Sequence, residues 1–247
     1  MRRFFTEPQN ISSETAYIYE DSKHIEKVLR MEPGDEIIIF DGTGYEYYAK
    51  LEKIESNCCI AEIFDKRFSQ SEPDVKISLF QGIPKSGKME TIIQKSVELG
   101  VYEIFPVIMD RCVVKLSSSA ACEKVKRWNK VSLEAVKQCG RGIVPKVHMP
   151  VSFEEAVCAL GALDLPLMPY ELLGHNGECG LKNALGSVKD AKSYGLLVGP
   201  EGGFSDSEAL YAADKKIKTI GLGKRILRTE TVASALIPVI MFYNGEF

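Results

Sequence analysis

The stretch Tyr194-Gly-Leu-Leu-Val198-Gly199-Pro-Glu-Gly-Gly203-Phe204-Ser205 predicts how the second half of the chain folds. Its first five residues are typical of a buried strand, and a glycine-rich turn follows them. Glycine has no Cβ, so the main chain of such a turn can approach a ligand closely. Ser205 and Glu208 have the spacing of a helix-capping box. A strand, a glycine turn and a helix start in this order predict an α/β crevice that binds a small molecule, although an ordinary connecting turn fits Gly199–Gly203 equally well.

Strand and helix patterns alternate on both sides of this stretch. Such alternation predicts an α/β fold with a mostly parallel sheet and helices on both of its faces. The predicted strands cover residues 75–81, 101–108, 165–170, 194–198 and 218–222, and the predicted helices cover 89–99, 121–139, 153–160 and 205–215, with a weaker helix after residue 170 and a last helix from Glu230.

The last predicted helix contains Val232–Phe242, which are apolar on nearly every side. A helix of this kind is costly to leave on a free surface. We therefore expect it to be buried, and a contact between two copies of the chain would bury it.

The first part of the chain has a different pattern, in which short strands alternate with tight turns. Asp41-Gly-Thr-Gly44 is a hairpin signal, and one short helix over Ser22–Met31 interrupts the series. These features predict a small β-barrel, and the polar segment Phe68–Asp74 predicts a linker after it. The predicted strands of this part cover residues 17–19, 36–40, 45–54 and 58–64.

Length and composition limit the class of protein. A chain of 247 residues with 45% hydrophobic content has room for two domains, each with its own core. No apolar stretch approaches the roughly 18 residues that span a bilayer, and Met1–Phe5 has no signal-peptide core after it. We expect a cytoplasmic protein that makes no membrane contact.

Cysteine and histidine usage indicates no metal site. The seven cysteines are odd in number and never spaced Cys-x-x-Cys, which argues against disulfides and zinc. Metal binding by His175 and Cys179 would need two further ligands that the sequence does not offer. The three histidines lie far apart, and no Gly-x-Ser-x-Gly sequence suggests a nucleophilic serine.

The net charge of −3 conceals an uneven distribution along the chain. Residues 75–150 carry 13 basic and 6 acidic side chains, whereas residues 1–74 carry 9 and 16. A basic middle segment predicts a face that binds phosphate, although solvated helices often carry such charges. The cations of this segment include Lys85, Lys88, Arg111, Lys115, Lys124, Lys126, Arg127, Lys130, Lys137, Arg141 and Lys146.

One segment resembles a nucleotide-binding P-loop. Gly82-Ile-Pro-Lys-Ser-Gly87-Lys88-Met89 follows a predicted strand and precedes a helix, as a P-loop does. The match fails at its last position, because Met89 has no hydroxyl group for Mg²⁺, although Asp110 could stand for a metal-binding carboxylate. A nucleotide hydrolase therefore stays an alternative. The other interpretation is that Lys85 and Lys88 contact RNA phosphate.

Several segments share their order and spacing with one known family. They are Arg3-Phe4, residues 24–30, 95–101, Arg127-Trp128, residues 134–141 with Pro145, Tyr170-Glu171, and residues 199–203 and 222–231. Together they cover nearly the whole chain, which resembles the RsmE family of ribosomal small-subunit RNA (uracil-N3)-methyltransferases of the SPOUT class. The chain departs from the family pattern at Val232, at Pro238 and across residues 174–192.

The resemblance implies a PUA-like barrel over residues 1–70 and a methyltransferase domain with a trefoil knot over residues 75–247. It also implies a homodimer that acts on small-subunit ribosomal RNA, with an RNA site formed by both subunits. S-adenosylmethionine is the implied cofactor, held largely by main-chain groups. The implied cofactor-binding residues are Leu172, Leu173, Gly199, Glu201, Gly202, Leu222, Gly223 and Leu227.

The resemblance and the chemistry together suggest roles for two side chains. Uracil N3 carries a proton, and we expect Arg228 to stabilise the negative charge that develops when this proton leaves. Glu230 is the nearest candidate to accept the proton, although acidic residues also favour the first turn of a helix for structural reasons. The predicted RNA contacts are Arg2, Arg3, His24, Arg30 and Arg141. A non-catalytic RNA-binding module remains a second alternative, and the sequence leaves the general base and the target nucleotide open.

Overall fold

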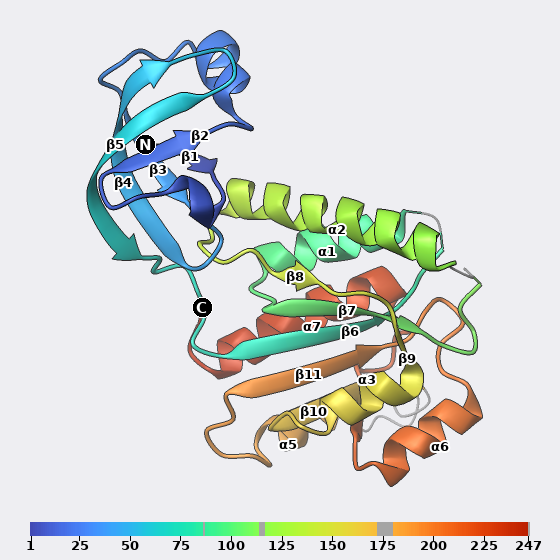
Figure 1. The fold of residues 1–247 in the computed structure, drawn as a ribbon. Helices are drawn as coiled ribbons and strands as arrows, with labels where there is room; N and C mark the ends of the chain where they lie inside the picture. The colour runs from blue at the N-terminus through green and yellow to red at the C-terminus, as the bar shows by residue number, and fades with distance from the viewer. Residues whose placement is uncertain (86, 114–116, 172–179, 247) are drawn as a thin grey trace. The chain divides into compact units, whose positions relative to one another are not determined.

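The computed structural model describes residues 1–85, 87–113, 117–171 and 180–246 (Figure 1). The chain forms two compact units, each with its own sheet. The first unit contains Met1–Glu72 and Val136–Val144, and the second contains Pro73–Ala135 and Pro145–Phe247.

The first unit is built on a five-stranded curled sheet with the strand order β1-β3-β4-β5-β2. Only β1 and β3 are parallel, and the other neighbours are antiparallel. The two edge strands β1 and β2 do not pair within this fully described unit, so the sheet is a half-barrel, in agreement with the small barrel that the pattern predicted. Its elements are β1 (Arg2–Phe5), η1 (Pro8–Asn10), β2 (Thr15–Ile18), η2 (His24–Val28), β3 (Glu36–Phe40), β4 (Tyr45–Ile54) and β5 (Cys59–Phe68).

The hairpin between β3 and β4 follows the predicted turn chemistry. The carboxylate of Asp41 accepts hydrogen bonds from the backbone N–H and the hydroxyl group of Thr43 and from the hydroxyl group of Tyr47. Gly42 and Gly44 have φ values of +80° and +103°, which glycine adopts more readily than other residues. The predicted bounds of β3 and β4 are confirmed.

The predicted helix over Ser22–Met31 is too long. The structure has a five-residue π-helical segment, η2, in which the backbone N–H of Leu29 donates to the carbonyl oxygen of His24. Arg30 then takes a left-handed backbone conformation with φ of +50°, which ends the helical path. Strand β1 is a further element that the sequence pattern did not predict.

An unexpected segment, Val136–Val144, belongs to the first unit. The carboxylate of Glu72 holds it by accepting from the backbone N–H groups of Gly142 and Ile143 and by pairing with the guanidinium of Arg141 at 2.8 Å. Both side chains of this ion pair are about 5% exposed. The sequence-based division into two domains at the linker did not assign Val136–Val144 to the first domain.

The second unit is an α/β structure around a seven-stranded parallel sheet, as predicted. The strand order is β12-β10-β11-β6-β7-β8, and β9 also pairs with β7. Its elements are β6 (Lys76–Gly82), α1 (Lys88–Glu98), β7 (Glu103–Ile108), α2 (Ser118–Cys139), β8 (Lys146–Val147), β9 (Val151–Ser152), α3 (Phe153–Leu160), β10 (Leu165–Pro169), α5 (Leu181–Leu185), β11 (Ser193–Val198), α6 (Asp206–Asp214), β12 (Lys218–Ile220) and α7 (Thr229–Tyr243). The last residues of α2 pass into the first unit.

Helices cover both faces of this sheet (Figure 1). On one face, side chains of α3 and α6 pack on strand residues such as Phe80, Leu197 and Met168. On the other face, α1 and α7 lie against each other. The capping boxes that begin α3 and α6 are complete, and the second is the predicted pair of Ser205 and Glu208.

The apolar last helix, α7, is buried along one side only. Leu236, Ile237 and Ile240 are fully buried, whereas Phe242 and Tyr243 are exposed in the single chain. The expectation of burial therefore holds for one face of the helix.

Two further observations concern topology and membranes. The trefoil knot implied by the family resemblance stays a prediction, because strand pairing alone does not trace how the chain is threaded. No helix within the described residues is both long and apolar enough to cross a membrane.

Candidate functional site

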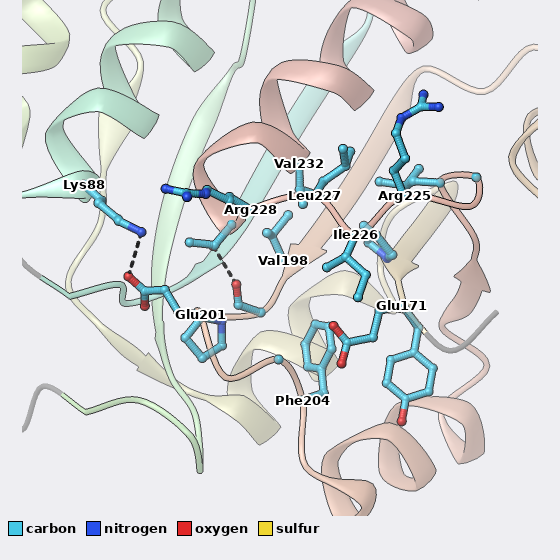
Figure 2. Close-up of a pocket in the computed structure, with 18 of the residues that line it drawn as sticks. Lys88, Glu171, Val198, Glu201, Phe204, Arg225, Ile226, Leu227, Arg228 and Val232 are labelled. Carbon is cyan, nitrogen blue, oxygen red and sulfur yellow. Dashed lines mark hydrogen bonds and ion pairs between the residues drawn. The ribbon is translucent and has the colours of Figure 1, made fainter. Parts of the chain in front are cut away.

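A cavity of about 330 Å³ lies in the second unit at the carboxyl ends of β10, β11 and β12. The carboxyl edge of a parallel sheet is the usual place for ligands in α/β folds. Three segments form its walls, namely Pro169–Glu171, Val198–Phe204 and Leu222–Val232, and Lys88 reaches it from α1 (Figure 2).

The glycine turn after β11 is tightly folded against its surroundings. A Cβ on Gly199 would lie 3.3 Å from the backbone of Gly203, which itself has φ of +67°. A Cβ on Gly82 would lie 2.7 Å from the backbone nitrogen of Pro200. The main chain therefore lines the cavity here with no intervening side chain at Gly199 and Gly203, as the sequence predicted.

A hydrogen-bonded hub joins this turn to α7. The hydroxyl group of Thr229 donates to the carbonyl oxygen of Gly199 at 2.7 Å and accepts from the side-chain amide of Gln81 at 2.9 Å. Gln81 is completely buried and lies at the end of the central strand β6. The hub thus ties two walls of the cavity to the middle of the sheet.

A lysine bridges two carboxylates beside the cavity. The ammonium group of Lys88 lies 3.2 Å from the carboxylate of Glu230 and 3.3 Å from that of Glu201, as Figure 2 shows for the second pair. The carboxylate of Glu201 also accepts from the backbone N–H of Lys85. These contacts connect the start of α1 with the glycine turn and with the first turn of α7.

The bridge changes the acidity of all three groups. A hydrogen bond to Glu230 is the main cause that raises the pKa of Lys88. The pKa of Glu230 is lowered by the backbone N–H of the same residue, then by Lys88 and the charge of Arg228. Burial alone would raise the pKa of Glu201, but hydrogen bonds from backbone N–H groups and from Lys88 lower it. Both carboxylates are therefore held in their ionised form.

The structure places most of the predicted cofactor-binding residues on the cavity wall. Gly199, Glu201, Leu222, Gly223 and Leu227 all line it. Gly202 lies beside Arg111 instead, and its carbonyl oxygen accepts a hydrogen bond from that guanidinium. Leu172 and Leu173 lie outside the described residues.

Sequence reasoning missed several residues of the wall. They are Lys88, Val198, Phe204, Ile226, Thr229 and Val232. Their positions after strands or beside the glycine turns could have identified them. Their residue types could not, because such residues are also common in ordinary cores and at helix starts.

The two predicted catalytic residues lie close together. Arg228 lines the cavity and is exposed, immediately before the first residue of α7. Glu230 lies two residues further along the chain and is joined to Lys88. Glu230 is not itself one of the residues that line the cavity, but its partner Lys88 and its neighbour Arg228 both are.

The predicted RNA contacts have different surroundings in the first unit. Arg2, His24 and Arg30 are exposed. Arg3 pairs with Glu46 at 2.7 Å and donates to the carbonyl oxygen of Arg141. Arg141 is only 4% exposed and forms an ion pair with Glu72. Arg3 and Arg141 therefore make contacts that stabilise the first unit. An RNA contact by either arginine stays a prediction.

The P-loop-like segment leads into α1 but does not have the surroundings of a nucleotide site. Lys88, its last cation, is paired with two carboxylates. Within the described ranges, no three His, Cys, Asp or Glu side chains gather in a way that could hold a metal ion. The predicted pair of His175 and Cys179 lies outside those ranges.

Comparison with known proteins gives consistent matches over nearly the whole chain. Residues 71–241 match the model of an RNA methyltransferase domain, and residues 20–64 match that of an RNA methyltransferase PUA domain. The ribosomal RNA small subunit methyltransferase E of Bacillus subtilis is 33% identical, with 94% of this chain and 92% of the relative covered. The protein of the same name from Mesomycoplasma hyopneumoniae is 31% identical, with coverage of 96% and 97%.

A solved structure agrees with these matches. The crystal structure of a ribosomal RNA small subunit methyltransferase E from Neisseria gonorrhoeae bound to S-adenosyl methionine has a TM-score of 0.83 to this protein. The two chains are 33% identical, and 98% of this chain and 97% of the other are covered. The chain therefore belongs to the family of RNA methyltransferases that includes ribosomal RNA small subunit methyltransferase E.

Proposed function

We propose that this protein acts in the cytoplasm as a homodimer and transfers the methyl group of S-adenosylmethionine to N3 of a uridine in small-subunit ribosomal RNA. The observation that carries the proposal is the cavity at the carboxyl edge of the sheet, with an arginine and an ionised carboxylate beside it. Family membership supports the reaction type, and the basic middle segment supports an RNA substrate.

The residues of the cavity fit the proposed cofactor. The close approach of Gly199 and Gly203 leaves main-chain groups to bind the polar parts of the ligand, and Leu222, Leu227 and Val232 supply apolar contacts. When bound, the sulfonium group supplies an activated methyl group. The protein then has to align the acceptor nitrogen and exclude water, and alignment of two bound reactants is worth roughly 7–11 kcal/mol.

The side chains at the cavity account for the change in charge on the uracil base. Removal of the N3 proton leaves negative charge on the neighbouring carbonyl oxygens, and the guanidinium of Arg228 stabilises it. The carboxylate of Glu230 accepts the proton, directly or through water. The lowered pKa of Glu230 keeps this group ionised at neutral pH.

Two measurements test the reaction and the cofactor. Small-subunit RNA from a strain that lacks the protein should accept labelled methyl groups, and mass mapping should place them on uracil N3. Calorimetry should detect S-adenosylmethionine binding and no comparable binding of ATP with Mg²⁺. Tight ATP binding without S-adenosylmethionine binding would instead support the nucleotide hydrolase.

Replacement of the arginine tests its role. Arg228→Ala should lower kcat by about 10²- to 10³-fold, the range found when one group that stabilises a developing negative charge is removed. Binding of S-adenosylmethionine should change much less, because main-chain groups hold the cofactor. Arg228→Lys keeps the charge and should retain part of the activity. Equal methyl transfer by wild type and Arg228→Ala would contradict the proposed role, and transfer by neither would point to a non-catalytic RNA-binding module.

The exposed side of α7 supports the homodimer. Val239, Phe242 and Tyr243 are 41, 75 and 51% exposed in the single chain, and an apolar helix face of this kind gains from burial against a second copy. Phe242→Asp should therefore shift the protein from dimer to monomer in light-scattering measurements. Leu210→Asp, at a 73% exposed position on α6, is the matched control and should leave the mass unchanged. A monomeric wild type would overturn this part of the proposal.

A further inference from the structure

The ion-paired lysine at the start of α1 has no role in the mechanism described so far. Its ammonium group contacts carboxylates from two segments that are more than 100 residues away in sequence, the turn after β11 and the first turn of α7. Its side chain is 33% exposed, and those of Glu201 and Glu230 are 26% and 23% exposed. The three groups therefore lie at the border between the cavity and solvent.

The two carboxylates differ in how their oxygen atoms are used. Both oxygens of Glu201 lie within 3.2 Å of the backbone N–H of Lys85, so this residue also fastens the segment before α1. Glu230 receives a hydrogen bond from Lys88 with suitable geometry, whereas the contact between Lys88 and Glu201 is an ion pair only. Lys88 thus acts more directly on Glu230.

We infer that Lys88 is a positioning residue for methyl transfer, which holds the carboxylate of Glu230 in place and ionised while the target base covers the cavity. This inference rests on the proposed function, in which Glu230 accepts the N3 proton as the N–CH₃ bond forms and the C–S bond of the donor breaks. The electron pair of the C–S bond goes to sulfur.

The physical reason is desolvation. A base that enters the mouth of the cavity displaces water from Glu230, and loss of water favours the neutral form of a carboxylic acid. A protonated Glu230 cannot accept the proton of uracil. A nearby cation opposes this effect, because it favours the ionised form.

Among the residues that the structure describes, two cations act on Glu230. Lys88 faces it from α1, Arg228 lies before α7, and Glu201 from the glycine turn shares Lys88 with it. Arg228 is proposed to interact with the substrate itself. Lys88 can therefore stay paired with Glu230 when substrate is bound.

Lys88→Met is the decisive variant, and Lys95→Met is its matched control. Lys95 lies on the same helix and pairs with Glu98 at 2.9 Å, but it does not line the cavity. We expect Lys88→Met to lower kcat by about tenfold at pH 6, with a smaller change in KM. The kcat of this variant should approach that of the wild type as the pH is raised. The acidic limb of its pH profile for kcat should lie at higher pH than that of the wild type, since Glu230 then needs a higher pH to ionise. Lys88→Arg should restore most of the rate, and Lys95→Met should behave like the wild type.

A double-mutant cycle shows whether Lys88 acts through Glu230. Glu230→Gln removes the proposed proton acceptor, so Lys88→Met should cause little further loss in that background. Calorimetry with S-adenosylmethionine confirms that each variant still binds the cofactor and is folded. A loss in Lys88→Met that is the same at every pH, or is fully additive with Glu230→Gln, would overturn the inference.

The inference and the proposed function fail in different ways. If the wild-type protein methylates no small-subunit RNA, the proposed function is wrong. If the wild type is active and Glu230→Gln is equally active, the role of Glu230 is wrong and Lys88 has no group to position. If Glu230→Gln is strongly impaired while Lys88→Met matches Lys95→Met at every pH, only the inference about Lys88 is wrong.

Discussion

Thr229 shows how one hydroxyl group can join distant parts of the cavity wall. It accepts from Gln81 of the central strand and donates to the carbonyl oxygen of Gly199, 30 residues earlier in the chain. Gln81 and Thr229 are buried, so a polar atom that loses its partner between them has little water to replace it. Thr229 is therefore one of the side chains that fix α7 relative to the glycine turn.

Thr229→Val tests this network with a change of nearly equal shape. The valine leaves the amide of Gln81 and the carbonyl of Gly199 without this partner, which should lower the free energy of unfolding by about 1–3 kcal/mol. Affinity for S-adenosylmethionine should fall as well, because the glycine turn loses its anchor. Urea unfolding and calorimetry measure the two effects. Thr231→Val, at an exposed position on the same helix, should change neither quantity noticeably.

Local sequence signals predicted several residues well and others poorly. Ser205 and Glu208 form the predicted capping box, because such a cap depends only on residues within one helical turn. Lys88 stood out in the sequence as part of a P-loop-like segment and of the basic middle segment. Its actual partner Glu230 is 142 residues away, and no local pattern contains that contact.

At the scale of elements, the turn that precedes β11 is fastened by one carboxylate. Asp164 accepts hydrogen bonds from the backbone N–H groups of Lys192 and Ser193 and from the hydroxyl group of Ser193. The hydroxyl group of Ser193 is the main cause that lowers the pKa of Asp164. The carboxylate thus fixes where β11 begins beside β10.

This arrangement predicts a pH dependence of stability. A carboxyl group whose pKa is lower in the folded state stabilises that state above its ordinary pKa, which is 3.8 for an aspartate such as Asp164, and loses the effect as the pH falls. Asp164→Asn should therefore be less stable than the wild type at pH 7, and the difference should shrink below about pH 4. Urea unfolding at several pH values measures it. Asp214→Asn, at an exposed position paired with Lys215, is the control, and a constant difference for Asp164→Asn would contradict the explanation.

The elements themselves were predicted where periodicity was strong. The bounds of β3, β4 and α3 agree with the sequence prediction, because apolar residues mark each of them and turn or cap residues lie at their ends. The two-residue strands β8 and β9 were missed, since two residues carry no period. The helix over Ser22–Met31 was overextended because the apolar face of Ile25, Val28 and Leu29 gives no sign that Arg30 turns the backbone.

At the scale of the whole molecule, the uneven charge predicts how RNA affinity responds to salt. Lys124, Lys126, Arg127 and Lys130 are exposed along α2, in the segment with the excess of basic residues. If these side chains neutralise phosphates, the slope of log affinity against log salt should be about −0.7 for each contact to single-stranded RNA. The slope separates such contacts from binding that does not depend on charge.

A double variant on α2 tests the predicted salt dependence of RNA binding. Lys124→Ala with Lys126→Ala should weaken RNA binding and make the slope less steep by about 1.4, which corresponds to two lost contacts. Fluorescence anisotropy at a series of salt concentrations measures it. Lys215→Ala with Lys216→Ala, which removes two exposed charges after α6, should leave the slope unchanged. A flat slope for the wild type would remove α2 from the RNA-binding surface.

The amino-acid sequence by itself determined that a β-rich part is followed by an α/β part. It also determined the parallel sheet with its helices and the glycine turn at the carboxyl edge of that sheet. These features depend on apolar spacing and on turn and cap residues, which act over a few neighbouring positions. Only the tertiary structure showed that Val136–Val144 returns to the first unit, that Arg141 is buried against Glu72, and that Lys88 joins Glu201 and Glu230. Such contacts join charges that lie far apart along the chain, and their existence depends on where the packed core places each backbone segment.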